Sequence, residues 1–181
     1  MERPIIKISY RWSEGEMLLL NRIHMRNSAQ GRKLTRGFKS TGIIFLVMGT
    51  IAFCSIGATP EKLRALCFGF GLVLLGVALL WGMPYLNRTA VLKMYAKKPD
   101  KDLVMTYEVS DDGISCKSDV ASSEMLWRVI VRGLRAKEGF LLYISDIQTH
   151  WLPIHGFQDA TDVSRFADLT KAKVQDYKEA S

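Results

Sequence analysis

Two long apolar runs dominate the hydrophobic pattern of this chain. Residues 40–60 and 65–87 contain no charged side chain, and only the four residues 61–64 separate them. At a rise of about 1.5 Å per residue, either run as a helix would cross a hydrocarbon core about 30 Å thick. The pattern therefore predicts a hairpin of two transmembrane helices, at residues 38–60 and 65–87.

Small residues recur on one face of each predicted helix. They are Gly42, Gly49 and Gly57 in the first run, and Ala65, Gly69 and Gly76 in the second. Spacings of four, seven and eight place each set on one side of its helix, where two backbones can approach closely. We expect the two helices to pack through these faces. A homo-oligomer formed through the same faces is an alternative, and a third interpretation is that glycine is common in membrane helices.

The chain before the first run predicts a strand and a helix. Apolar and polar residues alternate over residues 6–12, which is typical of a strand with one buried face. Ser13 stands three residues before Glu16, the spacing of a capping box, and predicts a helix from Glu14 to about Arg26. A short N-terminal strand needs partners from elsewhere in the chain.

The segment after the second run predicts β-structure. Helix is expected until Pro99, followed by strands near residues 103–109, 114–118, 125–132, 134–136, 140–145 and 150–154. Residues 110–113 form a turn, Pro153 indicates an edge or terminal position, and Thr161 or Asp162 caps a closing helix. We expect one domain of about seven strands, built from residues 1–30 and 102–181, with the hairpin inserted. The fold class predicted is an α+β membrane protein with a small β-barrel or sheet capped by a C-terminal helix.

Charge is distributed unevenly along the sequence. The formal net charge is +7, yet residues 102–181 hold nine basic against thirteen acidic groups. The positive charge lies in residues 1–39 and 88–101, beside the apolar runs. The positive-inside rule then places both termini in the cytoplasm and the chain in the cytoplasmic (inner) cell membrane as a multi-pass protein. An acidic C-terminal part argues against nucleic-acid binding.

The basic residues beside the runs are candidate contacts for lipid headgroups. They attract anionic lipid by about 1 kcal/mol each near a surface. The alternative is that they only set the topology. They are Arg32, Lys33, Arg36, Arg88, Lys93, Lys97 and Lys98.

No residue pattern indicates catalysis, a metal site or a cofactor. His150 and His155 are five residues apart and would lie on opposite faces of a strand. Asp111 and Asp112 suit a turn, and the serines have no nucleophile motif around them. Trp127 and Trp151 are expected in the core, with a ligand groove as the alternative. We therefore expect no enzyme activity and no cofactor.

A string of residues in the C-terminal part is similar to a known family. Tyr107, Gly113-Ile114, Trp127, the run Phe140–Ile144 and Leu152-Pro153, followed by a final helix, resemble the YcxB-like C-terminal domain. The family in turn resembles bacterial membrane proteins with pleckstrin-homology-like domains. The resemblance implies a barrel with a capping helix, and it implies no catalytic residue.

The pattern as a whole predicts a membrane-anchored, non-enzymatic binding or regulatory module on the cytoplasmic side. Its expected partners are the lipid bilayer and an unidentified protein. The alternatives are a domain that recognises anionic lipid, or a membrane-bound enzyme whose site the sequence does not reveal.

Overall fold

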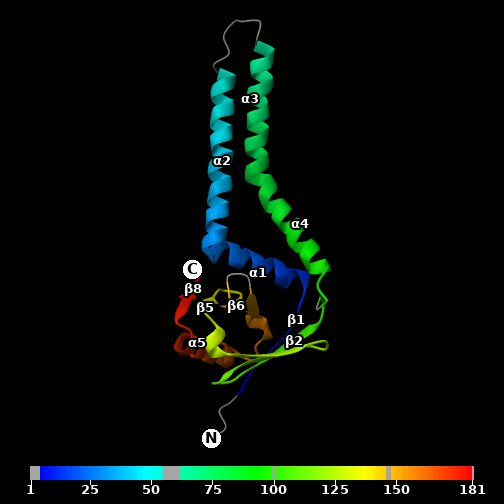
Figure 1. Ribbon diagram of the computed structural model, residues 1–181, viewed down its shortest axis with the longest axis vertical. Coiled ribbons are helices and arrows are strands. Elements are labelled where there is room, and N and C mark those ends of the chain that lie inside the picture. The colour runs from blue at the N-terminus through cyan, green and yellow to red at the C-terminus, as the bar shows by residue number, and fades with distance from the viewer. Residues whose placement is uncertain (1–4, 55–61, 100, 146–147, 181) are drawn as a thin grey trace. The chain divides into compact units, whose positions relative to one another are not determined.

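The computed structural model describes residues 5–54, 62–99, 101–145 and 148–180. The chain divides into two compact units, residues 1–24 with 94–181 and residues 25–93. We call the first the sheet unit and the second the helical unit. The helices α1 (Glu14–Asn27) and α4 (Met83–Ala96) carry the chain from one unit to the other (Figure 1).

The sheet unit contains two four-stranded sheets. The first has the order β1-β2-β3-β4 and is antiparallel throughout. The second has the order β7-β6-β5-β8, with β8 parallel to β5. Their strands are β1 (Ile6–Arg11), β2 (Val104–Val109), β3 (Gly113–Lys117), β4 (Ser122–Leu126), β5 (Arg132–Arg135), β6 (Gly139–Tyr143), β7 (Thr149–Pro153) and β8 (Asp176–Glu179).

The prediction of a small barrel of about seven strands is therefore wrong. The described residues form eight strands in two separate sheets, with no closed barrel. A 3-10 turn at Trp127–Val129 interrupts the chain between β4 and β5, so the strand expected over residues 125–132 is divided between the two sheets. The eighth strand, β8, follows the last helix and was not expected, because residues 176–179 are polar and do not alternate clearly.

The N-terminal strand pairs with a segment almost a hundred residues later. Ile8 lies opposite Tyr107, and Tyr10 lies opposite Met105. The burial pattern of β1 alternates as the sequence predicts, with Ile8 fully buried. The expected long-range pairing is confirmed, and it follows from the need of the apolar face and the backbone groups of β1 for partners.

The core of the sheet unit lies between the inner faces of the sheets and helix α5 (Ala160–Lys173) (Figure 1). Phe166 of α5 meets Phe140 of β6 edge to face, with ring centroids 4.8 Å apart. Asp159, rather than Thr161 or Asp162, caps this helix and accepts from the backbone N–H of Asp162 at 2.7 Å. An isolated bridge between Ile8 and Phe157 joins β1 to the segment after β7.

Several local predictions are confirmed. The backbone N–H of Glu16 donates to Ser13 Oγ at 3.3 Å, so α1 begins at the expected cap. Residues 110–113 form the turn between β2 and β3, where Ser110 N–H donates to the carbonyl of Gly113. Pro153 is the last residue of β7, which is an edge strand, so its missing N–H interrupts no ladder.

The helical unit corrects the predicted membrane hairpin. Its elements are the end of α1, α2 (Ala29–Cys54), α3 (Lys62–Val77), a π-helical turn (Ala78–Gly82) and most of α4. Among the residues described, no single helix has the length and apolar composition to cross a membrane. Within the described ranges, only Cys67–Gly82 and Pro84–Ala96 taken together have that length and composition. The two segments are bent by 44° relative to each other. The predicted transmembrane helices at 38–60 and 65–87 are therefore wrong.

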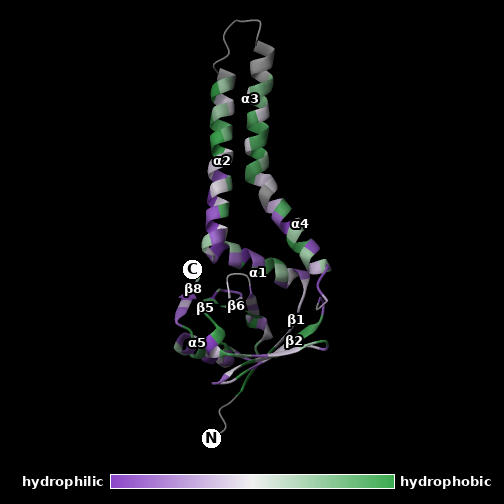
Figure 2. Cartoon of the chain, in the orientation of Figure 1, coloured by the Kyte–Doolittle hydropathy of each residue, from purple (hydrophilic) through white to green (hydrophobic). Residues whose placement is uncertain are grey.

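The reason is that a charge-free run of sequence is not equivalent to one helix. Helix α2 begins before the first run, and its N-terminal part is hydrophilic up to Lys39 (Figure 2). Its described part ends at Cys54, six residues before Pro60. The second run is divided, because the π-helical turn separates α3 from α4.

Close packing of α2 and α3 through glycine is confirmed for the described positions. Gly42, Gly49, Gly69 and Gly76 are all buried. A Cβ atom at Gly49 would lie 2.8 Å from the carbonyl oxygen of Gly69, and one at Gly76 would lie 2.8 Å from that of Gly42. The helices therefore approach to a distance that only glycine permits. Gly57 and the side chain of Ala65 lie outside the described part.

Candidate ligand-binding cavity

The sheet unit contains a partly open cavity of about 230 Å³. It lies where the end of β1, the inner faces of β2 and β3, and the edge strand β7 meet the segment after α4. The side chains around it are aromatic or small and polar. They come from Tyr10, Trp12, Lys98, Met105, Tyr107, Cys116, Ser118, Ala121, Ser122, Ser123, Thr149, His150 and Trp151.

Alternation along the strands brings the aromatic residues to one side. Tyr10 and Trp12 are two residues apart near the end of β1, and Tyr107 lies on the inner face of the neighbouring strand β2. The rings of Tyr10 and Tyr107 stack with an interplanar angle of 5° and centroids 6.2 Å apart. Trp12 meets Tyr10 edge-on at 6.2 Å. Flat aromatic surfaces thus form one wall of the cavity.

The opposite wall is held in place by hydrogen bonds. Tyr10 Oη donates to the carbonyl oxygen of Trp151 at 2.7 Å, which connects the two sheets. The indole Nε1 of Trp151 donates to the carboxylate of Glu16 on α1. The same carboxylate lies 3.5 Å from His155 Nε2. These contacts fix the ring of Trp151, so this part of the cavity is preformed.

Two residues of the cavity lining, Trp12 and Lys98, carry polar groups and contact each other. The indole Nε1 of Trp12 is buried and has no hydrogen-bond partner among the described residues. Lys98 Nζ lies 5.3 Å from the centroid of the Trp12 ring, in cation–π geometry. An unpartnered buried donor is uncommon in proteins and calls for an explanation.

Burial favours the neutral forms of His150 and Tyr107 in the cavity. Desolvation lowers the pKa of His150 below its usual value, so the imidazole is uncharged at neutral pH. Burial raises the pKa of the Tyr107 phenol well above its usual value, with the neighbouring Tyr10 as a smaller cause. The rings of Tyr107 and His150 meet edge to face, with their centroids 6.1 Å apart. No Asp or Glu lines the cavity among the residues described, so Lys98 is its charged group.

A second hollow, of about 380 Å³, lies between the start of β1 and α5. Arg165 and Asp168 line it, but the Arg165 guanidinium is 2.9 Å from Asp162 within the same helix. This ion pair is a contact within the surface helix α5 and gives no indication of a ligand.

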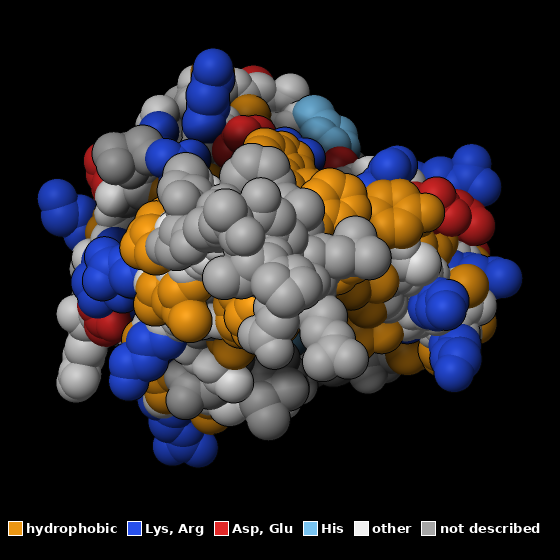
Figure 3. Space-filling view, turned by 90° about the horizontal axis from the view of Figure 1, so that it is seen from above, with side chains coloured by type: hydrophobic (Ala, Val, Ile, Leu, Met, Phe, Trp, Pro, Cys, Tyr) orange, Lys and Arg blue, Asp and Glu red, His pale blue; other side chains and the backbone are white. Residues whose placement is uncertain are grey.

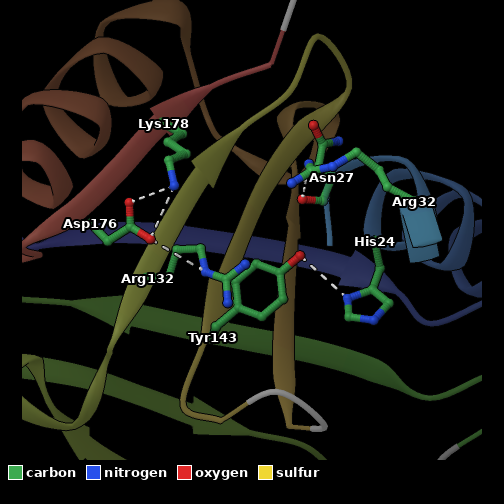
Figure 4. Close-up of polar contacts among 7 residues, drawn as sticks. All are labelled: His24, Asn27, Arg32, Arg132, Tyr143, Asp176 and Lys178. Atoms are coloured by element: carbon green, nitrogen blue, oxygen red, sulfur yellow. Dashed lines mark hydrogen bonds and ion pairs between the residues drawn. The ribbon is translucent and has the colours of Figure 1, made fainter. Parts of the chain in front are cut away.

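Polar contacts near β8 have a structural role (Figure 4). Arg132 stacks over the Tyr143 ring at 4.5 Å and lies 3.6 Å from Asp176, which also pairs with Lys178 at 3.0 Å. On the other side of the ring, Tyr143 Oη is 3.3 Å from His24 Nδ1. The network ties β8 and α1 to the second sheet.

The candidate headgroup contacts are distributed over both units. Arg32, Lys33 and Arg36 are exposed on α2, while Arg88 and Lys93 are exposed on α4. Arg32 Nη1 donates to the carbonyl oxygen of Asn27 at 2.7 Å (Figure 4). Lys97 and Lys98 belong to the sheet unit, and of the seven only Lys98 lines the cavity.

The other residues weighed in the sequence have clear positions. Trp127 is a core residue whose Nε1 donates to the Ser110 carbonyl at 2.9 Å. Trp151 is buried as expected and also borders the cavity. In the described ranges, no group of three His, Cys, Asp or Glu residues could hold a metal ion.

Comparison with known proteins identifies part of the sheet unit. Residues 109–170 match the model of the family described as YcxB-like protein. The chain carries a YcxB-like domain. Comparisons with curated proteins and with solved structures found no match. The YcxB-like span runs from the end of β2 into α5 and supplies His150 and Trp151 to the cavity. Trp12 and Lys98 lie outside the span, so the match says nothing of these two groups.

Sequence reasoning missed Trp12 and Tyr107 as cavity residues. Their place in alternating strands predicted burial but not which buried residues border a space. A signal was present nonetheless, because Trp12 is the last apolar residue of its strand and stands beside a polar turn. Aromatic residues at strand ends often retain one edge toward a cavity or solvent.

Proposed function

We propose that this protein is a non-enzymatic binding module that takes a small ligand in the cavity of the sheet unit. The observation that carries the proposal is the partly open cavity itself, whose lining combines aromatic rings with the hydroxyl groups of serine and threonine. A preformed pocket with few polar groups is the usual form of a small-molecule site. The volume of about 230 Å³ lies below the range of about 300–1,000 Å³ usual for such sites, which favours a ligand of one ring.

The arrangement supports binding better than catalysis. His150 lines the cavity and its lowered pKa favours the neutral imidazole, which is the form that a general base requires. Its ring, however, contacts the Tyr107 ring, and no hydrogen bond joins it to a hydroxyl or thiol among the residues described. No carboxylate lines the cavity to orient the imidazole. Covalent catalysis would need a nucleophile within hydrogen-bond reach of a base, and a third group that orients this base.

A paired screen tests this proposal. The purified full chain is assayed for thermal stabilisation by a library of small metabolites and for turnover by a panel of esterase, phosphatase and peptidase substrates. We expect ligands that raise the unfolding temperature and no turnover. Turnover that disappears in His150→Gln would show that the protein is an enzyme and that our proposal is wrong. The variant His24→Gln is the control, because His24 contacts Tyr143 and does not line the cavity.

A second candidate function is association with a lipid bilayer. The helical unit exposes large apolar side chains that soluble proteins rarely leave uncovered together. They include Ile43, Ile44, Val47, Met48 and Ile51 on α2, and Phe68, Phe70 and Leu74 on α3, all more than half exposed except Met48, which is 50% exposed. Hydrophobic side chains are also plain in the space-filling view (Figure 3). The exposed Arg32, Lys33 and Arg36 on α2 would favour anionic headgroups.

Liposome flotation measures this association. We expect the full chain to float with phosphatidylcholine vesicles and more strongly with vesicles that contain phosphatidylglycerol. Replacing Arg32, Lys33 and Arg36 with Gln should remove the preference for anionic vesicles, since each contributes about 1 kcal/mol. Replacing Lys171 and Lys173 of α5 with Gln should not. A protein that stays at the bottom of the gradient with both vesicles would exclude lipid association.

A further inference from the structure

Strand β4 leaves one edge of the first sheet open. The described residues place no further strand beside it, and every residue of β4 except Met125 is exposed. The other edge strands of the sheet unit are better protected. β1 forms a bridge to Phe157, the last three residues of β7 are buried, and three of the four residues of β8 are charged. An exposed strand edge is a template for pairing with another chain.

The pairing with β3 fixes which backbone groups of β4 point outward. In the turn before β4, the N–H of Ser118 donates to the carbonyl oxygen of Ala121. Hydrogen-bonded and non-hydrogen-bonded pairs alternate along an antiparallel ladder, so Ser123 and Met125 are the residues of β4 that bond to β3. The outward N–H and C=O groups belong to the alternate residues Ser122, Glu124 and Leu126.

Two antiparallel registers would pair β4 with a second β4 over most of its length. In the register centred on Glu124, the two carboxylates would lie directly opposite each other, which is destabilising. In the register centred on Ser123, Glu124 lies opposite Ser122 of the second copy. Val120 then lies beside Leu126 of the second copy, and both side chains are exposed in the single chain, by 64% and 46%. Charge and apolar contact thus favour the register centred on Ser123.

We propose that the open edge of β4 binds β4 of a second copy of this chain, antiparallel and centred on Ser123. The two four-stranded sheets then form one sheet of eight strands, and the two-fold axis makes every contact occur twice. An interface built mainly on one strand from each copy is small, so we expect a dimer that dissociates on dilution. The dimer needs no ligand in the cavity, so its test is independent of the proposed function.

Cysteine cross-linking measures the register. Residues that face each other at a non-hydrogen-bonded position have Cα atoms about 4.5 Å apart, within the range of a disulfide. In the full chain with its three native cysteines replaced by Ala, Ser123→Cys should therefore give a disulfide-linked dimer on oxidation with diamide. Ser122→Cys should not, because the two copies of this position are diagonal neighbours about 7–8 Å apart. Ser9→Cys, at an exposed position of β1, is the control for random collision.

A proline variant removes the strand pairing itself. Glu124→Pro deletes one outward N–H of β4, and proline is tolerated in edge strands where the N–H faces away from the sheet. Sedimentation of the full chain in dodecyl maltoside, which covers the exposed apolar side chains of α2 and α3, measures the dimer. We expect association to weaken at least about tenfold, because each copy loses one hydrogen bond. Glu124→Gln keeps the N–H and should retain the dimer. Circular dichroism checks that both variants remain folded.

Several results would overturn the inference. These are a chain that stays monomeric at every concentration, a disulfide in Glu124→Cys rather than in Ser123→Cys, equal cross-linking in Ser9→Cys, or an unchanged dimer in folded Glu124→Pro. If the chain is monomeric and an extended peptide from a displayed library shifts the amide signals of Ser122 and Glu124, the edge binds a peptide and the second copy is wrong.

Discussion

Replacing Ile8 with Asp is expected to destabilise the sheet unit strongly. Ile8 is fully buried, pairs with Tyr107 in β2 and forms the bridge to Phe157 that joins β1 to the chain after β7. A carboxylate here would lose its hydration, and the apolar contacts of isoleucine would be lost as well. We expect a loss of about 4 kcal/mol in the free energy of unfolding, which is a large part of the roughly 5–15 kcal/mol typical of a domain.

The measurement is urea denaturation of the full chain, followed by tryptophan fluorescence. Ser9→Asp is the matched control, because Ser9 is the next residue of β1 and faces solvent. It should cost less than about 1 kcal/mol, the range of strand propensity. Similar midpoints for the two variants would show that β1 is not integrated in the sheet. Deleting residues 1–12 tests the same point, since it should expose the 102–181 segment to protease.

Replacing Gly76 with Leu is expected to separate α2 from α3. A Cβ at Gly76 would lie 2.8 Å from the Gly42 carbonyl oxygen and 2.9 Å from Leu46 Cγ. The first of these atoms is backbone, so no change of rotamer can relieve the contact, and the helices must move apart. We expect a loss of about 3 kcal/mol, at the upper end of typical overpacking costs.

Gly71→Leu provides the control on the same helix. A Cβ at Gly71 meets nothing within 4 Å, and glycine is the poorer helix former. This variant should stabilise α3 by up to about 1 kcal/mol. Thermal unfolding by far-UV circular dichroism and tryptic cleavage after Arg32, Lys33 and Arg36 measure both variants. Faster cleavage in Gly76→Leu alone is the expected result, and equal cleavage in the two would show that the glycine contact does not hold the helices.

Local pattern was sufficient for much of this protein. Alternation over residues 6–12 predicted which side of β1 is buried, because side chains in a strand point to opposite faces in turn. The Ser13–Glu16 spacing predicted the start of α1, and Pro153 predicted an edge strand. The glycine spacing predicted the face through which α2 and α3 pack. In each case a few neighbouring residues contain all the information.

Tertiary structure decided the rest. The absence of charge over residues 40–60 and 65–87 did not reveal where α2 begins or that a π-helical turn divides the second run, since hydropathy is insensitive to backbone breaks. The sequence also left open whether the strands close into a barrel, because closure depends on pairing between distant strands. The parallel pairing of β8 with β5 depends on where α5 returns the chain.

The cavity is the clearest case. Trp12, Lys98 and His150 are widely separated in sequence, and nothing local relates them. They border one space because β1 pairs with β2 and because Tyr10 bonds the backbone of β7. Residue type alone determined that Trp12 would be buried and would carry a donor. Only the packing of two sheets decided that this donor has no acceptor in the described chain, because hydrogen-bond satisfaction depends on every neighbour in space.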